Sequence, residues 1–294
     1  MSTPVQNLEE IKARMGLSLN ITGLPPQDPN LGLDYIAGAG DTFVVSYPRC
    51  GRTWMSHILW SMRNNGAAYP KDGPGLYREH LWLERSGRAA VEALPSPRTI
   101  LCHLPLDLIP KHPEAKYICL TRNPKDVEVS WYFHNLGFGL IKESDIDFSG
   151  HFDNFLKGKL VHGSYFDHLK SYMPHLNDTN VMVIKYEALL SNGKEILQNL
   201  ADFLQISTSN DLIGKVLNNT SISEMKSDQT RWIPIAQLNY PLVRQGQAGA
   251  WRKVLTAEQS ERVDEKFREE THGMPAENWW QDEMRWIPKE KKDQ

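Results

Sequence analysis

The sequence predicts a single α/β domain with a central parallel sheet flanked by helices. Short apolar stretches rich in β-branched residues alternate with helical periodicity along the chain, which is typical of this class. The first clear strand also runs through a short cationic loop directly into a helix, as in a P-loop-like unit. With 294 residues, 40% of them hydrophobic, the chain can bury one substantial core.

The predicted domain spans residues 41–270, after an N-terminal extension at 1–40 and before a C-terminal tail at 271–294. We expect the tail to pack its tryptophans on the domain and to end in a charged, frayed segment. Further strands are predicted at 99–102, 116–121 and 181–185, and further helices at 193–204 and 256–269.

Residues 42–47 are apolar, β-branched and aromatic, as expected of a strand inside a parallel sheet, and Pro48 ends the strand. A helix with one buried face is predicted next, because apolar residues recur at i, i+3, i+4 and i+7. These residues are Met55, Ile58, Leu59 and Met62, and Asn64-Asn65-Gly66 then ends the helix.

The loop between this strand and helix contains Arg49, Cys50, Gly51, Arg52, Thr53 and Trp54. Free backbone N–H groups and the helix dipole favour an anion at a helix N-terminus, and a glycine lets the anion approach closely. The loop therefore predicts a phosphate site, although an ordinary turn with two solvated arginines is the alternative. It is neither a Walker A loop, which ends Gly-Lys-Ser/Thr, nor a phosphatase loop on Cys50, since Ser56 stands six residues later.

A second cationic loop follows the strand at 116–121. Asn123 is a good N-cap, Pro124 suits the first helical position, and Asp126 lies three residues after the cap. Arg122 therefore lies at another helix start. Ser130 lies about two turns along that helix, so the two side chains are candidate ligands of one anionic group.

A third loop combines Arg244 and Gln245 with two glycines three residues apart, Gly246 and Gly249. Glycines beside an arginine indicate a loop folded over a ligand, although an ordinary surface turn has the same composition. Each loop alone is unremarkable. The three together indicate a nucleotide with two separated phosphate groups.

In these segments the chain resembles the cytosolic sulfotransferases, which transfer a sulfuryl group from 3′-phosphoadenosine 5′-phosphosulfate (PAPS) to a hydroxyl or amine and release 3′-phosphoadenosine 5′-phosphate (PAP). The resemblance runs from about residue 43 to 267. The first loop is similar to the family's 5′-phosphosulfate loop, usually Tyr-Pro-Lys-Ser-Gly-Thr-Thr-Trp. Arg122 and Ser130 match its site for the 3′-phosphate, and Arg244 to Gly246 resembles its Arg-Lys-Gly clamp on the same phosphate.

Other segments carry the resemblance further. Cys102-His103-Leu104-Pro105 is similar to the Thr-His-Leu-Pro segment that holds the catalytic base, which implies that His103 is the base. The first loop implies that Arg49 is the cation that stabilises the leaving group. Without the resemblance, a histidine that ends an apolar strand is more often structural. The implied nucleotide contacts, adenine included, are Arg49, Cys50, Gly51, Arg52, Thr53, Trp54, Arg122, Ser130, Tyr186, Thr220, Ile222, Met225, Arg244, Gln245 and Gly246.

The chain also departs from the family pattern. Arg49 replaces the lysine of the first loop, and a guanidinium is a poor proton donor because it stays charged. Leu101 replaces a lysine two residues before the base, Gln245 replaces the clamp lysine, and Ile222 stands where an aromatic ring often stacks on adenine. These changes keep a second hypothesis open, a non-catalytic or weakly active relative that binds PAP or PAPS. A phosphoryl-transfer enzyme is disfavoured by the missing Walker motif.

The resemblance places the acceptor near Tyr77, Trp82, His103, Phe133 and Phe138, among polar residues such as Arg78, Glu84 and His134. The acceptor is expected to be a small phenol, alcohol or amine, and this mixture favours a polar or cationic one, unless Arg78 and Glu84 simply pair. Residues 226–243 lack periodicity, which is typical of a lid and also of an ordered surface loop. The resemblance implies a lid over acceptor and nucleotide.

Composition sets the remaining expectations. A net charge of −3 gives no reason to expect nucleic acid. Three cysteines, an odd number without metal-like spacing, argue against a disulfide framework and suit a reducing compartment. The sulfuryl transfer that the resemblance implies needs one base and a few cations but no metal. The N-terminus lacks an apolar signal core, and no stretch approaches the roughly 20 apolar residues of a membrane span, so we expect a cytoplasmic protein without membrane contact. The family's dimer motif appears only in part, from Arg252 to Glu261, which leaves a homodimer open.

Overall fold

The computed structural model describes residues 8–15, 30–73, 75–227, 231–232, 241 and 243–287. Within them, five parallel strands form one sheet in the order β2-β3-β1-β4-β5. The strands are β1 (Asp41–Ser46), β2 (Leu81–Trp82), β3 (Arg98–Cys102), β4 (Lys116–Thr121) and β5 (Val181–Lys185). This arrangement confirms the predicted single α/β domain with a parallel sheet.

Strand β1 occupies the centre of the sheet, and all six of its residues are buried. Val44 pairs with Leu101 of β3 on one side and with Ile118 of β4 on the other. After β1, the chain adds β2 and β3 on one side of β1 and then crosses to add β4 and β5 on the other side, so the strand order reverses at β1. In open α/β sheets, such a reversal leaves a crevice at the carboxyl ends of the strands, where ligands bind.

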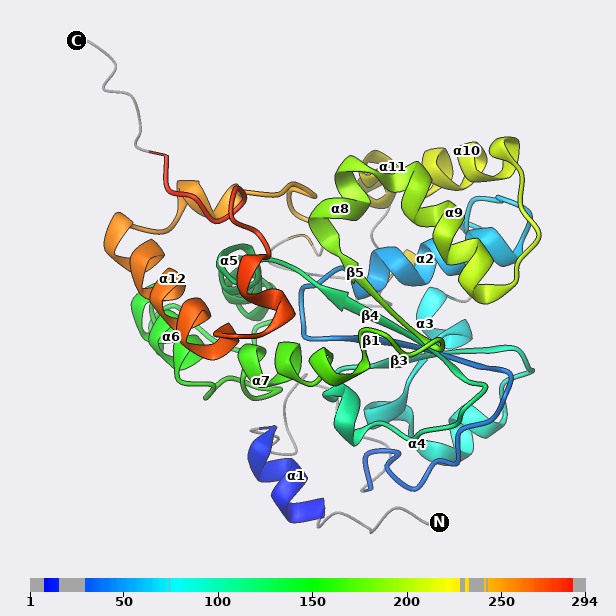
Figure 1. Cartoon of the computed structure of the whole chain (residues 1–294), viewed down its shortest axis with the longest axis horizontal. Helices are drawn as coiled ribbons and strands as arrows, with labels where there is room; N and C mark the ends of the chain where they lie inside the picture. The colour runs from blue at the N-terminus through cyan, green and yellow to red at the C-terminus, as the bar shows by residue number, and fades with distance from the viewer. Residues whose placement is uncertain are drawn as a thin grey trace.

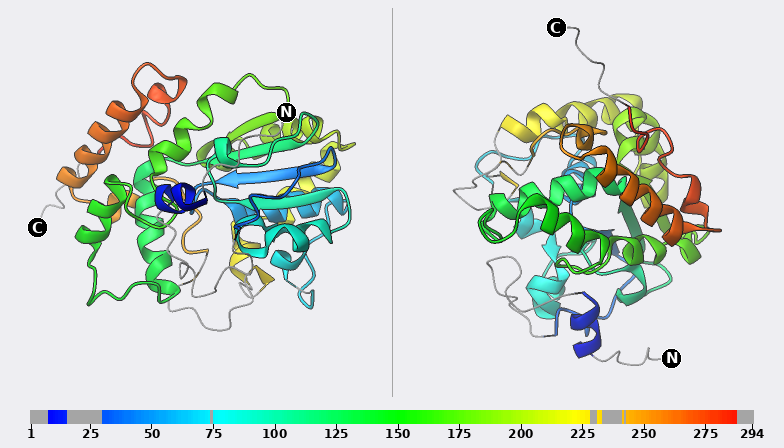
Figure 2. Two further views of the ribbon diagram at one scale, coloured as in Figure 1. Left: turned by 90° about the horizontal axis from the view of Figure 1, so that it is seen from below. Right: turned by 90° about the vertical axis from the view of Figure 1, so that its left-hand side faces the viewer.

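Helices cover the sheet, as Figures 1 and 2 show. Helix α2 packs on β1 and contacts α10, α9 packs on β5, and α4 packs on β3. Helices α5, α6, α7 and α12 form a group beyond the carboxyl ends of the strands, at the left of Figure 1. The helices are α1 (Leu8–Arg14), α2 (Arg52–Arg63), α3 (Leu76–Glu79), α4 (Leu83–Glu92), α5 (Pro124–Gly137), α6 (Phe148–Leu156), α7 (Tyr165–Lys170), α8 (Tyr186–Ser191), α9 (Gly193–Leu204), α10 (Asn210–Asn219), α11 (Ile222–Ser227) and α12 (Ala257–Thr271), with short 3-10 turns at Leu106–Leu108, Met173–His175, Ala250–Lys253 and Pro275–Asn278.

The predicted helices at 193–204 and 256–269 correspond to α9 and α12. Asn123 caps α5 as predicted, because its side chain accepts a hydrogen bond from the backbone of Asp126 at 3.0 Å. The first strand ends one residue before its predicted end. The sequence did not predict β2 and α4, since β2 has two residues and α4 is kinked at Gly87, whose φ is 74°.

The C-terminal segment contacts the core through its tryptophans. Trp280 is only 3% exposed, and its indole N–H donates to the carboxylate of Glu187 at 2.7 Å. Trp279 and Trp286 are half-buried against the same core. The frayed end and most of the expected lid lie outside the described residues. None of the described helices is long and apolar enough to span a bilayer.

Candidate active site

The three cationic loops meet in one cavity of about 540 Å³ at the carboxyl edge of the sheet. Arg49 follows β1, Arg122 follows β4, and Arg244 reaches the same space from the chain beyond α11. Because the strand order reverses at β1, the loops after β1, β3 and β4 are brought together there. The wall also contains Gly51, Arg52, Thr53, Trp54, Tyr77, Trp82, His103, Ser130, Phe138, Tyr186, Ile222, Met225, Gln245 and Gly246.

The first loop presents an open helix N-terminus to the cavity. Gly51 is the N-cap of α2 with φ of 101°, and no side chain caps this helix. The first turn of α2 contains no acidic residue. A Cβ on Gly51 would come within 2.9 Å of the Tyr186 ring, so glycine is what lets the loop lie against that ring. The free backbone N–H groups and the helix dipole are therefore available to an anion.

Arg49 links the first loop to α5. Its Nε donates to Oγ of Ser130 at 3.0 Å, and its own backbone carbonyl accepts from Nη1 of Arg122 at 3.4 Å. Burial, and secondarily the neighbouring Arg122, lower the pKa of Arg49 to about 10. Arg49 still carries its charge at neutral pH, and its neighbouring cation Arg122 adds a second positive charge that favours binding of an anion.

Arg122 lies flat on Tyr186, with its guanidinium carbon 4.4 Å from the ring centroid. Its Nη2 donates to the carbonyl of Gln247 at 2.9 Å and lies 3.9 Å from the carboxylate of Asp126. In the described part of the chain, Nε of Arg122 and Nη1 of Arg52 are buried without a hydrogen-bond partner. Unsatisfied buried guanidinium groups are unfavourable, and the oxygens of an anionic ligand would satisfy them.

Asp126 attaches the third loop to the second. Its carboxylate accepts from the backbone N–H groups of Gly249 at 2.6 Å and Trp251 at 3.1 Å. Gly246 has a φ of 67°, and a Cβ there would come within 2.4 Å of the Ile222 side chain, so the glycine lets the loop lie close to α11. Arg244 stacks on Phe133, with its guanidinium carbon 4.4 Å from the ring centroid.

His103 follows β3 and is 7% exposed. Its Nδ1 lies 2.6 Å from the carbonyl oxygen of Ser46. Because a carbonyl can only accept, Nδ1 carries the proton and Nε2 keeps the free lone pair. Burial, followed by the charge of Arg52, lowers the pKa of His103 well below 6.5. The imidazole is therefore neutral at neutral pH and can accept a proton at Nε2.

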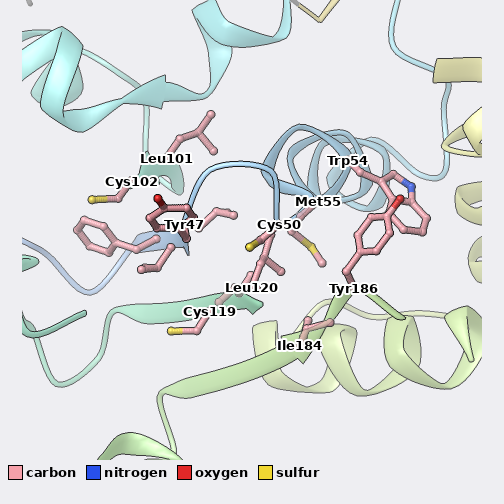
Figure 3. Packing of buried hydrophobic residues seen from close by; sticks show 14 of the residues in the cluster. Tyr47, Cys50, Trp54, Met55, Leu101, Cys102, Cys119, Leu120, Ile184 and Tyr186 are labelled. Carbon is pink, nitrogen blue, oxygen red and sulfur yellow. The ribbon is translucent and has the colours of Figure 1, made fainter. Parts of the chain in front are cut away.

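Three of the predicted site residues do not line the cavity. Cys50 is buried under its loop, beside Met55 and Leu120 (Figure 3). The carbonyl of Thr220 accepts from the indole N–H of Trp54 at 2.8 Å, and Phe133 supports Arg244. The other predicted residues line the cavity. The contacts of all of them with nucleotide and acceptor stay predictions.

The surroundings of His103 combine two residues that the sequence placed near the acceptor, Glu84 and Trp82, with His162, to which it gave no role. Oε1 of Glu84 accepts hydrogen bonds from the backbone N–H groups of His103 and Leu104. The rings of His162 and Trp82 lie 4.8 and 5.2 Å from the His103 ring, centroid to centroid. Nothing local in the sequence marks His162, which lies 59 positions from His103. A proton acceptor thus lies inside a largely aromatic enclosure.

No cluster of three or more His, Cys, Asp or Glu side chains suited to a metal ion occurs among the described residues. A reaction without a metal stays a prediction.

Comparison with known proteins gives consistent matches. Residues 39–275 match the family model described as the sulfotransferase domain. Human sulfotransferase 2A1 is 29% identical over 253 residues, covering 83% of this chain and 88% of the relative, and mouse sulfotransferase 1B1 is 30% identical over 254 residues, covering 81% and 85%. The crystal structure of mouse sulfotransferase SULT7A1 complexed with PAP is similar, with a TM-score of 0.69 and 27% identity, covering 84% of this chain and 90% of that one.

Proposed function

The chain belongs to the sulfotransferase family, and on that basis we propose that it transfers a sulfuryl group from PAPS to a hydroxyl or amine of a small-molecule acceptor. The supporting observation is the position of His103, whose Nε2 is free to accept a proton in the same cavity as Arg49, Arg122 and Arg244. The PAP complex of the mouse relative supports the choice of nucleotide.

In this proposal different arginines bind the two charged ends of the nucleotide. The N-terminus of α2, with Arg49 and Thr53, binds the 5′-phosphosulfate. Arg122, Ser130 and Arg244 bind the 3′-phosphate. The buried Nε of Arg122 lacks a partner in the described part of the chain and would gain a phosphate oxygen. Tyr186 and Ile222 would contact adenine.

The chemistry follows from the state of His103. Its Nε2 removes the proton from the acceptor as the acceptor oxygen or nitrogen bonds to sulfur. The bond between sulfur and the bridging oxygen breaks, and its electron pair stays on the 5′-phosphate of PAP. Arg49 and the N–H groups of α2 stabilise that charge. Since Arg49 is a poor proton donor, it acts by charge alone.

The second hypothesis, a protein that binds PAP without transfer, uses the same arginines but needs no base. The neutral imidazole of His103, with Nδ1 committed to the carbonyl of Ser46, favours the enzyme.

The test is the His103→Ala variant, assayed for PAP release with phenols, alcohols and amines. We expect turnover to fall by about 10² to 10⁴-fold, while the dissociation constant for PAP, measured by calorimetry, stays unchanged. The matched variant Arg122→Met should show the opposite pattern, because its main effect should be a higher dissociation constant for PAP. A normal rate in His103→Ala would refute the base. A wild-type protein that binds PAP and transfers to no acceptor would support the second hypothesis, and magnesium-dependent ATP consumption would point to phosphoryl transfer.

The location and assembly of the protein are also part of the proposal. A cytoplasmic enzyme without membrane or nucleic-acid partners remains our expectation. A homodimer is less well supported, because the family's dimer motif is incomplete at residues 252–261. Light scattering at several protein concentrations would decide the assembly.

A further inference from the structure

The cavity has a second group of cations that the nucleotide proposal does not use. Arg52, Arg78 and Arg85 line it together with the aromatic residues Tyr77 and Trp82. Asp126 is the single acidic residue in the described lining, and its carboxylate already accepts hydrogen bonds from the third loop beside Arg122. The end of the cavity near Trp82 is therefore positively charged.

Arg52 belongs to this second group although it lies in the first loop. Its guanidinium carbon lies 4.6 Å from the Trp82 ring centroid and 5.9 Å from that of Tyr77. Its charge lowers the pKa values of His103 and His162, whereas Arg49 interacts electrostatically with Arg122 and Arg244. The guanidinium of Arg52 thus lies on the side of the base.

The charge of Arg52 is not matched within the described protein. The residue is 8% exposed, and its buried Nη1 has no hydrogen-bond partner there. Glu84 interacts electrostatically with Arg52, but no ion pair joins the two residues in the described part, burial raises the pKa of Glu84, and its Oε1 is committed to backbone N–H groups. An unmatched buried cation is unfavourable unless a ligand supplies the opposite charge.

Arg85 and Arg78 extend the positive charge along α4 and α3. Arg85 is half-buried, and burial lowers its pKa. The Tyr77 ring centroid lies 5.9 Å from the guanidinium carbon of Arg52, and Tyr77 lines the same cavity as Arg85. Neither Arg85 nor Arg78 forms an ion pair with another described residue. By contrast, Arg88, three positions along α4, is paired with Glu92 at 2.7 Å.

We propose that the acceptor is an anion, a hydroxyl-bearing aromatic compound whose carboxylate is bound by Arg52 and Arg85 while its hydroxyl faces Nε2 of His103. The aromatic wall from Tyr77, Trp82 and Phe138 accommodates the ring, and guanidinium groups bind carboxylates with favourable geometry. The sequence had favoured a polar or cationic acceptor. The positive charges that line the cavity favour an anionic acceptor instead. This inference rests on the proposed function.

The test uses three phenols that differ in charge at the far end: 4-hydroxyphenylacetate, its methyl ester and tyramine. We expect the ratio of kcat/KM for the acid over that for the ester to be about tenfold or more, with tyramine poorest. Arg85→Gln and Arg52→Thr should each lower the acid-to-ester ratio about tenfold. The control, Arg88→Gln, removes a cation from the same helix outside the cavity and should leave the ratio unchanged.

Equal use of the three phenols, or a preference for tyramine, would overturn the proposal, as would an acid-to-ester ratio that survives Arg85→Gln. If Arg52→Thr weakens PAP binding but leaves the ratio intact, Arg52 serves the nucleotide and the proposal fails. Calorimetry of acceptor binding to the PAP-bound protein distinguishes failure of the proposed function from failure of the proposed anion site. Binding of the acid that depends on Arg85, without transfer to any phenol, would refute the proposed function and keep the anion site. Failure of the acid both to bind and to react would refute the site.

Discussion

Glu84 and His103 are joined through the backbone, because Oε1 of Glu84 accepts from the N–H of His103 and, at 2.8 Å, from that of Leu104. Glu84 belongs to the first turn of α4, and His103 follows β3. Both residues are buried. The carboxyl therefore satisfies two N–H groups that no strand or helix pairs, and it fixes the segment that carries the proposed base.

Replacing Glu84 by alanine should destabilise the fold and impair turnover together. Two buried N–H groups would lose their acceptor, which we expect to lower the free energy of unfolding by about 2 to 5 kcal/mol. A displacement of His103 by about 1 Å would lower kcat by about 10²-fold. Urea denaturation and steady-state kinetics measure the two effects.

Glu84→Gln is the matched control, because the amide oxygen can accept the same two hydrogen bonds. Burial raises the pKa of Glu84, so the pocket already disfavours its charge. The Gln variant should be within about 1 kcal/mol of the wild type. Equal losses in the Ala and Gln variants would show that charge, rather than an acceptor for the backbone, is what Glu84 supplies.

Gly246→Ala should weaken PAP binding through a steric clash. Its φ is 67°, and the new Cβ would lie 2.4 Å from Cγ2 of Ile222, so the loop that carries Arg244 must shift. We expect the dissociation constant for PAP to rise by about tenfold. Isothermal titration calorimetry provides the measurement.

Gly139→Ala controls for backbone strain, because Gly139 has a φ of 66° and a Cβ added there would meet no described atom within 4 Å. It should lose a similar amount of stability and keep its PAP affinity. In the double variant with Ile222→Ala, part of the affinity lost by Gly246→Ala should return. If both alanine variants weakened PAP equally, the clash with Ile222 would not be the cause.

Tyr186 should contribute to PAP binding through the face of its ring. The guanidinium of Arg122 lies 4.4 Å from the ring centroid, and this contact holds the arginine over the cavity. Tyr186→Leu should weaken PAP binding by about fivefold, the effect of roughly 1 kcal/mol. Tyr186→Phe keeps the ring and should bind PAP as the wild type does. A loss in the Phe variant as large as in Leu would assign the effect to the hydroxyl.

The elements that form the proposed phosphate sites could be predicted because their signals are local. An apolar strand, a glycine and a helical periodicity lie within residues 41–65, and Asn123-Pro124 marks the start of α5. The parallel sheet followed from the same alternation, and the reversal of strand order then brings the loops together. The registers of β1 with β3 and β4 agree with this prediction.

The acceptor end could not be predicted in the same way, because its geometry depends on distant segments. Arg52 stands in a loop that binds phosphate in the family pattern, yet its guanidinium lies against Trp82 on β2. Glu84 was expected among polar acceptor contacts but lies behind the wall, bound to the backbone after β3. A strand of two residues gives no periodicity, so no sequence pattern could place these side chains.

His57 is a buried histidine whose two ring nitrogens have no hydrogen-bond partner in the described part of the chain. It is 1% exposed on α2, and its ring lies 4.4 Å from that of Trp232, centroid to centroid. Burial, followed by the charge of Arg231, lowers its pKa to about 4. The folded protein therefore holds this imidazole neutral, whereas the unfolded chain protonates it near pH 6.5.

This difference predicts a pH-dependent stability that His57→Leu should reduce. Between the folded pKa of about 4 and the unfolded value of about 6.5, the unfolded state binds more protons, so stability falls as the pH falls. From pH 7 to pH 5, His57 should account for about 2 kcal/mol of the lost unfolding free energy. Because leucine changes the packing equally at both pH values, its effect cancels when the unfolding free energy lost between pH 7 and pH 5 is compared. The exposed His272, replaced by Gln, is the control and should leave the loss unchanged. An identical loss in His57→Leu and wild type would show that the folded protein tolerates a charged His57.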